Sequence, residues 1–286
     1  MKKKLSIIIP SYNSNERLEL ALMKVCIFKS LEVIVVDDCG SQSCDILRNR
    51  FPNVIFYRQA INRGAGAARN KGLELASAEY ITFMDADDFI LSESVEELLG
   101  LLDGITDILY FSPTSHDVYG GKGKRHLKYE KMVLNYLYSE NKKDLLFKYH
   151  VPWSKVFRCA FLIKNELKFD EVSASNDVIF SLESSLSCKN VKVYDFCFYS
   201  VLSHSEGLTG TDTIQRLLDR LDVAIRYNAK LRAINKSQYR VTLLPIFYRL
   251  LKIAPKIALK FIIETKLLIS DWFPSCRVIA KFLGWR

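Results

Sequence analysis

Residues 80–88 read YITFMDADD, a short apolar stretch typical of a strand that leads directly into three acidic residues, Asp85, Asp87 and Asp88. Three carboxylates in four positions repel one another unless a cation lies among them. A hard divalent cation would relieve that repulsion and bind phosphate oxygens as well. The other interpretation is an acidic turn that caps the next helix. The position after a strand favours a ligand site, because ligands of open α/β sheets bind beyond the carboxyl ends of the strands.

The same alternation of strand and helix extends on both sides of this stretch, over residues 1–112. Short β-branched runs are separated by segments with helical spacing, which predicts a mainly parallel sheet covered by helices on both faces. The predicted strands are 5–9, 32–36, 54–57, 80–84 and 108–111, and the predicted helices are 15–28, 64–76 and 92–102.

Beyond residue 112 the pattern is looser, and the Gly/Lys-rich residues 120–124 predict a loop. From residue 211 to the end the chain is predicted to be helical, with breaks at Pro245, Pro255 and Pro274. Between these two regions, the predicted elements are a helix over 129–149, a mixed stretch over 151–170, a helix over 177–187 and a strand over 191–199. None of the seven cysteines forms a C-x-x-C pair, and no Cys/His cluster has the spacing of a zinc site.

Polar residues also end the first two predicted strands. Tyr12 follows the first strand, where it could stack on a base or be an ordinary half-buried aromatic residue. Asp37 and Asp38 end the second strand, where a carboxylate could accept hydrogen bonds from a nucleobase or a ribose, or could cap a helix. The residues alone leave both choices open.

Residues 62–70 read NRGAGAARN and open a predicted helix. A dinucleotide-binding G-x-G-x-x-G motif would need glycine where Arg69 stands, and it would follow the first strand. We expect the small residues instead to let a helix N-terminus approach an anionic ligand, with Arg63 and Arg69 available for phosphate.

Four motifs in the same order and spacing resemble glycosyltransferase family 2, which has the GT-A fold: IPSYN at 9–13, VVDD at 35–38, NRGAGAARN at 62–70 and FMDADD at 83–88. The resemblance is close over residues 4–100 and looser to about residue 210. It implies a GT-A domain at 1–210, with a nucleotide-sugar-binding half at 1–112 and an acceptor half at 113–210. A C-terminal helical extension at 211–286 would follow.

The resemblance also implies roles for individual residues. Asp87, helped by Asp85, would hold Mn²⁺ or Mg²⁺ on the donor diphosphate. Asp177 matches the second acid of a family pair and would be the catalytic base, while Asn176 stands where the first acid is usual. The implied donor-binding residues are Pro10, Tyr12, Asn13, Asp38, Asn62, Arg63, Gly64, Arg69 and Asp85.

On the acceptor side, the resemblance implies contacts from Trp153, Lys155 and Asn176. A sugar's apolar face stacks well on an indole, but a buried tryptophan is an equal alternative for Trp153. His204 and Ser205 lie in a segment similar to a flexible family loop that closes over the diphosphate. For His204 the alternative is a surface histidine.

Together these features predict an inverting glycosyltransferase that moves one monosaccharide from a nucleotide-diphosphate sugar to a lipid-linked glycan in cell-surface polysaccharide synthesis. Uridine is the commonest base in the family. The alternative is a catalytically inactive nucleotide-sugar binder or membrane scaffold, which the retention of Asp85, Asp87 and Asp177 disfavours. A processive synthase is disfavoured by the lack of spanning segments and of a Q-x-x-R-W sequence. A nucleotidyltransferase would normally carry a Gly-rich, Lys-containing loop after the first strand.

The C-terminal region is strongly basic. Net charge is +9 for the chain, and residues 241–286 hold eight bases and two acids, an excess of +6. Four of these bases fall on one helical arc beside aliphatic residues, which predicts a helix on an anionic membrane surface. The alternative is a helix packed on the catalytic domain with its lysines in water. Nucleic acid is disfavoured, because the apolar face is too wide for a groove-binding helix. The four bases are Arg249, Lys252, Lys256 and Lys260.

The location follows from the apolar segments. The run behind Met1 ends at Pro10, which is too short for a secretory signal. No charge-free apolar stretch approaches the roughly 20 residues of a spanning helix. We therefore expect a cytoplasmic protein attached peripherally to the inner face of the cell membrane.

Overall fold

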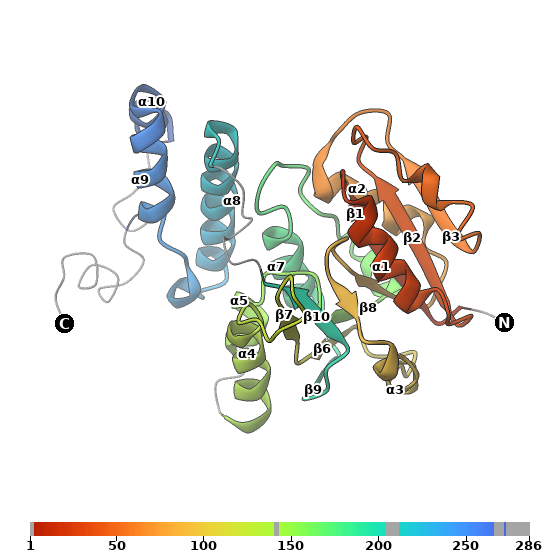
Figure 1. Ribbon diagram of the computed structural model, residues 1–286. Coiled ribbons are helices and arrows are strands. Elements are labelled where there is room, and N and C mark those ends of the chain that lie inside the picture. The colour runs from red at the N-terminus through yellow and green to blue at the C-terminus, as the bar shows by residue number, and fades with distance from the viewer. Residues whose placement is uncertain (1–2, 140–142, 204–211, 266–271, 273–286) are drawn as a thin grey trace.

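The computed structural model describes residues 3–139, 143–203, 212–265 and 272 (Figure 1). Its centre is a seven-stranded sheet in the order β3-β2-β1-β4-β8-β6-β9. Neighbouring strands run parallel except at β8, which is antiparallel to both β4 and β6. The strands are β1 (Leu5–Ser11), β2 (Leu31–Asp37), β3 (Val54–Arg58), β4 (Tyr80–Phe83), β6 (Ile108–Phe111), β8 (Lys155–Arg158) and β9 (Val191–Tyr194).

Helices cover both faces of this sheet. Because side chains alternate along a strand, Ile7 and Ile9 of β1 face one hydrophobic cluster while Ile8 faces another. The first cluster includes residues of α1 (Asn15–Val25) and α3 (Val95–Gly100). The second includes residues of α2 (Gly64–Leu75), α4 (Leu127–Tyr138), α5 (Lys143–Lys148), α6 (Cys159–Lys164) and α7 (Val178–Ser187). The predicted α/β fold class is confirmed.

A second, three-stranded sheet lies beside the carboxyl end of β4. Its order is β5-β10-β7, from β5 (Phe89–Ile90), β10 (Tyr199–Leu202) and β7 (Thr114–His116). Strand β10 is antiparallel to β5 and parallel to β7. Since β5 begins directly after Asp88, this sheet brings β7 and β10, which lie later in the chain, close to the acidic cluster.

The C-terminal helices pack beside α7. Helix α8 (Ile214–Ala233) packs on α7 through a shared hydrophobic cluster. Helices α9 (Leu244–Ile253) and α10 (Pro255–Thr265) form a further cluster with α8, at the opposite side of the molecule from β3 (Figure 1). The side chain of Asn228 bonds both the backbone N–H and the carbonyl of Val241, each at 2.8 Å, and so fixes the return from α8. Short 3-10 helices lie at Cys44–Leu47, Ser92–Ser94 and Ser237–Tyr239.

Several predicted elements differ from the observed ones. The predicted helix over 129–149 is two helices, α4 and α5, and the predicted strand over 191–199 is divided between β9 and β10 in different sheets. Strands β5, β7 and β8 were not predicted, because runs of two to four residues are too short to show a period. Pro245 and Pro255 each stand in the first turn of a helix, where proline is tolerated. Pro274 lies outside the described residues.

Within the described part of the chain, no helix has both the length and the apolar character needed to cross a bilayer.

Candidate active site

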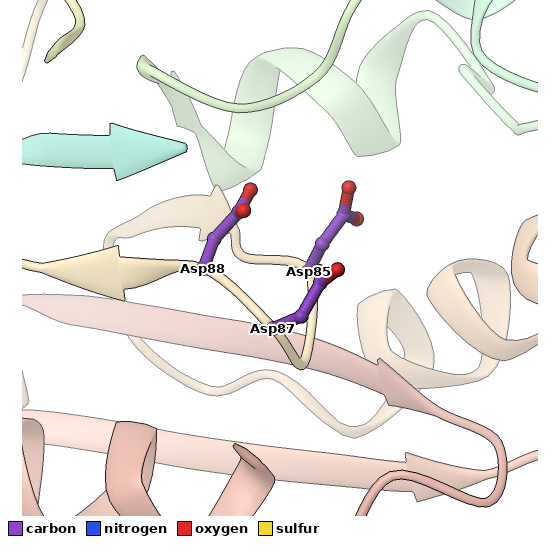
Figure 2. A group of neighbouring side chains, drawn as sticks. All are labelled: Asp85, Asp87 and Asp88. Atoms are coloured by element: carbon purple, nitrogen blue, oxygen red, sulfur yellow. The ribbon is translucent and has the colours of Figure 1, made fainter. Parts of the chain in front are cut away.

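The acidic cluster stands on the turn between β4 and β5. Figure 2 shows the side chains of Asp85, Asp87 and Asp88 on this one turn. Each offers a carboxylate oxygen, and the three oxygens lie within 4.8 Å of one another. Asp85 and Asp87 keep 29% and 27% of their side chains exposed, whereas Asp88 is fully buried. Carboxylates this close are suitable ligands for a hard divalent cation.

Asp88 is the buried member of the cluster, while Asp85 and Asp87 are ion-paired with Arg69 and Arg17. The hydroxyl of Tyr199 donates to its Oδ2 at 2.6 Å, and the backbone N–H of Leu202 donates to its Oδ1 at 2.7 Å. Desolvation raises the pKa of Asp88 well above its ordinary value, and the charges of Asp85 and Asp87 raise it further. A cation among the three would offset this repulsion, so the residues present fit a metal.

Tyr199 is a site residue that the motifs did not single out. Its hydroxyl accepts from the backbone N–H of Asp85 at 3.1 Å while donating to Asp88. One buried phenol therefore ties strand β10 to both ends of the acidic turn. A lone tyrosine in a later strand carries no local sequence signal of this role.

Arg69 connects the acidic turn with the segment that opens α7. It lies in α2 with a 6% exposed surface, and it donates from Nη2 to Asp85 Oδ1 at 2.6 Å and from Nη1 to Asn176 Oδ1 at 2.8 Å. Its guanidinium also stands over the ring of Phe169, 5.4 Å from the centroid. The sequence suggested that Arg69 would bind phosphate, but in the structure its charge is already paired with Asp85.

Arg63 is engaged in a similar way. Its guanidinium pairs with Glu171, so it too has an acidic partner. Gly66 allows a close approach between the same segments, because an added Cβ would lie 2.0 Å from the carbonyl oxygen of Asp170. The small residues of α2 therefore let this helix pack closely on residues 170–176. Asn62 is exposed just before the helix.

Asp177 lies at the start of α7, where it is the N-cap residue and makes no side-chain cap hydrogen bond. Desolvation raises its pKa above the ordinary aspartate value. Arg69 and Lys155 act in the opposite direction, and Asp85 adds to the increase. These interactions mean that the predicted base lies near the acidic turn and Arg69, although the two segments are far apart in the sequence.

The strand-end residues Asp37 and Asp38 are buried. Asp38 Oδ1 accepts from the Arg63 N–H at 2.8 Å and from Gln59 Nε2 at 2.7 Å, and its Oδ2 accepts from the Gly64 N–H at 2.7 Å. Asp38 therefore caps the start of α2, which is the second of the two roles that the sequence allowed for it. A base or ribose could reach only its remaining lone pairs.

The residues at and just beyond the end of β1 lie beside this cap. Pro10 is buried in the strand opposite Val36, while Tyr12 beyond the strand end is 54% exposed. Asn13 has a positive φ of 49°, and its Oδ1 accepts from Ser41 Oγ and the Gln42 N–H, both at 3.1 Å. Tyr12 therefore offers an exposed aromatic ring beyond the end of β1.

Two of the three predicted acceptor-side residues are buried. Trp153 is 1% exposed and stacks on Tyr199 with 5.7 Å between ring centroids and 7° between planes. Its indole offers no face to a sugar in this structure, so the alternative of a buried tryptophan describes it. Lys155 is also 1% exposed. Asn176 accepts from Arg69, as above, and His204 and Ser205 lie outside the described residues.

The fold and the acidic turn define a GT-A type protein, and the family follows from sequence. The model of glycosyl transferase family 2 matches residues 6–165, and the chain belongs to this family. It is 27% identical over 220 residues to the poly(ribitol-phosphate) beta-N-acetylglucosaminyltransferase TarP of Staphylococcus aureus. That match covers 71% of this chain and 64% of the relative, so the chain spans less than two thirds of that protein's length.

Two solved structures share the fold. S. aureus TarS 1-349 in complex with UDP-GlcNAc has a TM-score of 0.67 at 20% identity, covering 98% of this chain and 81% of that one. A mannosyltransferase from Pyrobaculum calidifontis in complex with GDP-Man and Mn²⁺ has a TM-score of 0.53 at 15% identity, covering 99% and 80%. At these identities the likeness is one of fold.

Proposed function

We propose that this protein is a metal-dependent, inverting glycosyltransferase that moves one sugar from a nucleotide-diphosphate donor to an acceptor hydroxyl. The observation that carries the proposal is the meeting of three groups from distant segments. Asp85 of the acidic turn, Arg69 of α2 and the residues that open α7 form one connected arrangement. Family membership supports this assignment.

Asp87 and Asp85 are the residues that would hold Mn²⁺ or Mg²⁺. When bound, such an ion neutralises negative charge on the departing nucleoside diphosphate. Arg69 fixes the direction of the Asp85 carboxylate, because its guanidinium is itself held by Asn176 and by the ring of Phe169. The P. calidifontis mannosyltransferase in complex with Mn²⁺ supports the choice of metal.

Asp177 is proposed as the general base. Its carboxylate would accept the proton of the acceptor hydroxyl while that oxygen attacks the anomeric carbon from the face opposite the diphosphate. One displacement inverts the configuration and needs no covalent sugar intermediate. A pKa raised by desolvation supports this role, since a base works best when its pKa approaches the working pH.

The substrate class is proposed from the relatives. The solved TarS complex contains UDP-GlcNAc, and TarP is named for transfer to poly(ribitol-phosphate). We therefore propose a UDP-sugar donor, with Tyr12 as the aromatic face for the base. A lipid-linked glycan or a related surface polymer is the proposed acceptor. The division into a domain at 1–210 and a helical region at 211–286 belongs to the same proposal.

Attachment to an anionic membrane is proposed for the surface of α9 and α10. The small residues Ala254 and Ala258 face inward, and several large aliphatic residues face outward. Lys252, Lys256 and Lys260 are exposed on the same helices. A basic and apolar surface of this kind fits the interface of an anionic leaflet. The outward aliphatic residues are Leu251, Ile253, Ile257, Leu259, Ile262 and Ile263.

The transferase proposal is tested by screening nucleotide sugars for thermal stabilisation with Mn²⁺ present. A donor at about 100 times its Kd should add about 2.7 kcal/mol to the free energy of unfolding. Nucleoside diphosphate should be released in the presence of the metal, and NMR should show an inverted anomeric centre. The matched variant is Asp177→Asn, which should bind the donor normally and lose about 10²- to 10⁴-fold in turnover. A wild-type chain that binds a donor but never turns it over would instead be an inactive binder.

A further inference from the structure

Lys155 is a buried cation that the proposed reaction does not use. It lies on β8 with 1% of its surface exposed. Its ammonium donates to the carbonyl oxygen of Tyr149 at 2.7 Å and is 3.4 Å from Ser181 Oγ. The rings of Tyr110 and Tyr149 lie 5.2 and 4.7 Å away. Both hydrogen-bond acceptors are neutral, which is an unusual environment for a buried lysine, because buried charges are normally paired.

The ammonium contacts the helix that carries the proposed base. Ser181 lies in the first turn of α7, and its backbone N–H donates to the carbonyl oxygen of Asp177 at 2.9 Å. The two charges also act on each other: Asp177 raises the pKa of Lys155, and Lys155 lowers the pKa of Asp177. Lys155 therefore reaches the base both through the helix backbone and through its charge.

Lys155 shares this effect with one neighbouring cation. Arg69 lowers the pKa of Asp177 more than Lys155 does, but Arg69 is also hydrogen-bonded to Asp85, whose charge raises that pKa. Near Lys155, burial lowers the pKa of His150 to about 4, so this imidazole is neutral at working pH. The phenols that face the two groups are neutral as well, since desolvation raises the pKa of each: Tyr110, Tyr129 and Tyr149.

Lys155 is charged in the range that matters for a carboxylate. Desolvation lowers the pKa of Lys155 to about 7, against an ordinary value of 10.5. Below about pH 7 the Lys155 side chain is therefore protonated, and this range includes the lower pH values at which an aspartate gains its proton. Its positive charge then favours the ionised form of Asp177, which burial would otherwise disfavour.

We propose that Lys155 is a positioning residue for the general base, whose buried ammonium holds the first turn of α7 and keeps the carboxylate of Asp177 ionised. This inference rests on the proposed role of Asp177. It moves Lys155 from the acceptor side, where the family resemblance placed it, to the interior behind the base.

The test compares kcat and KM over a range from about pH 5 to about pH 8 in the wild type and three variants. Lys155→Met removes the charge and the hydrogen bonds, and Lys155→Gln removes the charge but keeps a donor. Ser181→Ala keeps the charge and removes the contact with Lys155, together with the hydrogen bond from Ser181 Oγ to the carbonyl oxygen of His150. Both neutral variants should move the acidic limb of kcat upward by about 1 pH unit. Ser181→Ala should lower kcat without moving the limb, and Lys131→Met on the exposed face of α4 should match the wild type.

The KM for the donor should stay unchanged in the neutral variants, because Lys155 makes no hydrogen bond to the acidic turn. An acidic limb that stays in place in both neutral variants overturns the proposal. Asp177→Asn is measured in parallel to separate the two hypotheses. If it keeps its turnover, the assignment of the base fails. If it is inactive while the limb does not move, only the role of Lys155 fails.

A spectroscopic measurement covers the case in which neither neutral variant is active enough for a pH profile. Nitrogen-15 NMR of lysine-labelled wild-type protein follows the Lys155 ammonium, which is assigned by its loss in Lys155→Met. The proposal requires Lys155 to be charged at about pH 6, and a neutral amine at that pH overturns it.

Discussion

Two strand ends in this molecule carry adjacent acids, and the protein treats them in opposite ways. At the end of β2, Asp37 accepts from Gly40 N–H at 3.2 Å, Cys44 N–H at 3.1 Å and Arg58 Nη1 at 2.6 Å. Asp38 is likewise bonded by the residues that open α2. At the end of β4, Tyr199 and Leu202 enclose Asp88, whereas Asp85 and Asp87 are paired with Arg69 and Arg17 but stay partly exposed.

The comparison shows that an acidic pair after a strand can be structural or a candidate ligand site. The difference lies in how deeply the carboxylates are buried and how many backbone N–H groups they accept from. Asp37 and Asp38 are 2% and 4% exposed, whereas the side chains of Asp85 and Asp87 keep more than a quarter of their surface. A buried carboxylate surrounded by N–H groups organises loops. Asp85 and Asp87 are partly exposed, so a cation can reach them from solvent. Together with the desolvated Asp88 they repel one another, and a bound cation would relieve that repulsion.

The largest expected effect is at the β4 end. Asp87→Asn should remove most of the metal affinity and lower transfer by about 10²-fold or more, because several kcal/mol of charge stabilisation are lost. The melting temperature without metal should change little, since Asp87 is partly exposed. Turnover with and without Mn²⁺ and a thermal melt measure both quantities. Full wild-type activity in excess EDTA would show that the acids at the end of β4 do not form a required metal site.

A smaller effect is expected at the β2 end, and of a different kind. Asp37→Asn replaces one acceptor oxygen by an NH₂ group that faces an N–H donor, at a site that is 2% exposed. The free energy of unfolding should fall by about 2 kcal/mol, the usual cost of a buried unsatisfied group. Urea unfolding measures it, and turnover per folded molecule should be close to that of the wild type. A stable variant with a selectively reduced kcat would assign Asp37 to the site instead.

The smallest effect applies the same distinction to the basic helices. Arg249 of α9 is exposed but paired with Asp212 at 3.1 Å, so part of its charge is already neutralised. Lys256→Gln should weaken co-sedimentation with anionic liposomes by about 1 kcal/mol, whereas Arg249→Gln should weaken it less. Raising the salt from about 0.1 M to about 1 M should release part of the protein, because charge is screened and apolar insertion persists. Equal losses in both variants would show that pairing with Asp212 does not matter.

Much of the fold was predictable from the chain alone. The alternation of strand and helix predicts β1 to β4 and the helices between them, because each element is defined by a local period. The position of Asp85 and Asp87 at the carboxyl end of β4 follows from the same local pattern. The resemblance to the family added Asp177, whose proximity to the acidic turn no local pattern encodes.

What only the tertiary structure decided is which polar and aromatic groups are already occupied. The family resemblance places Trp153 and Lys155 on the acceptor side, with a buried tryptophan as an equal alternative, and the structure shows both side chains 1% exposed. The sequence predicts that Arg69 is available for phosphate, and the structure shows its guanidinium hydrogen-bonded to Asp85 and Asn176. Local sequence sets periodicity and turn chemistry. Burial and hydrogen-bond partners depend on segments up to 114 positions apart, as with Leu202 and Asp88, and these meet only when the chain has folded.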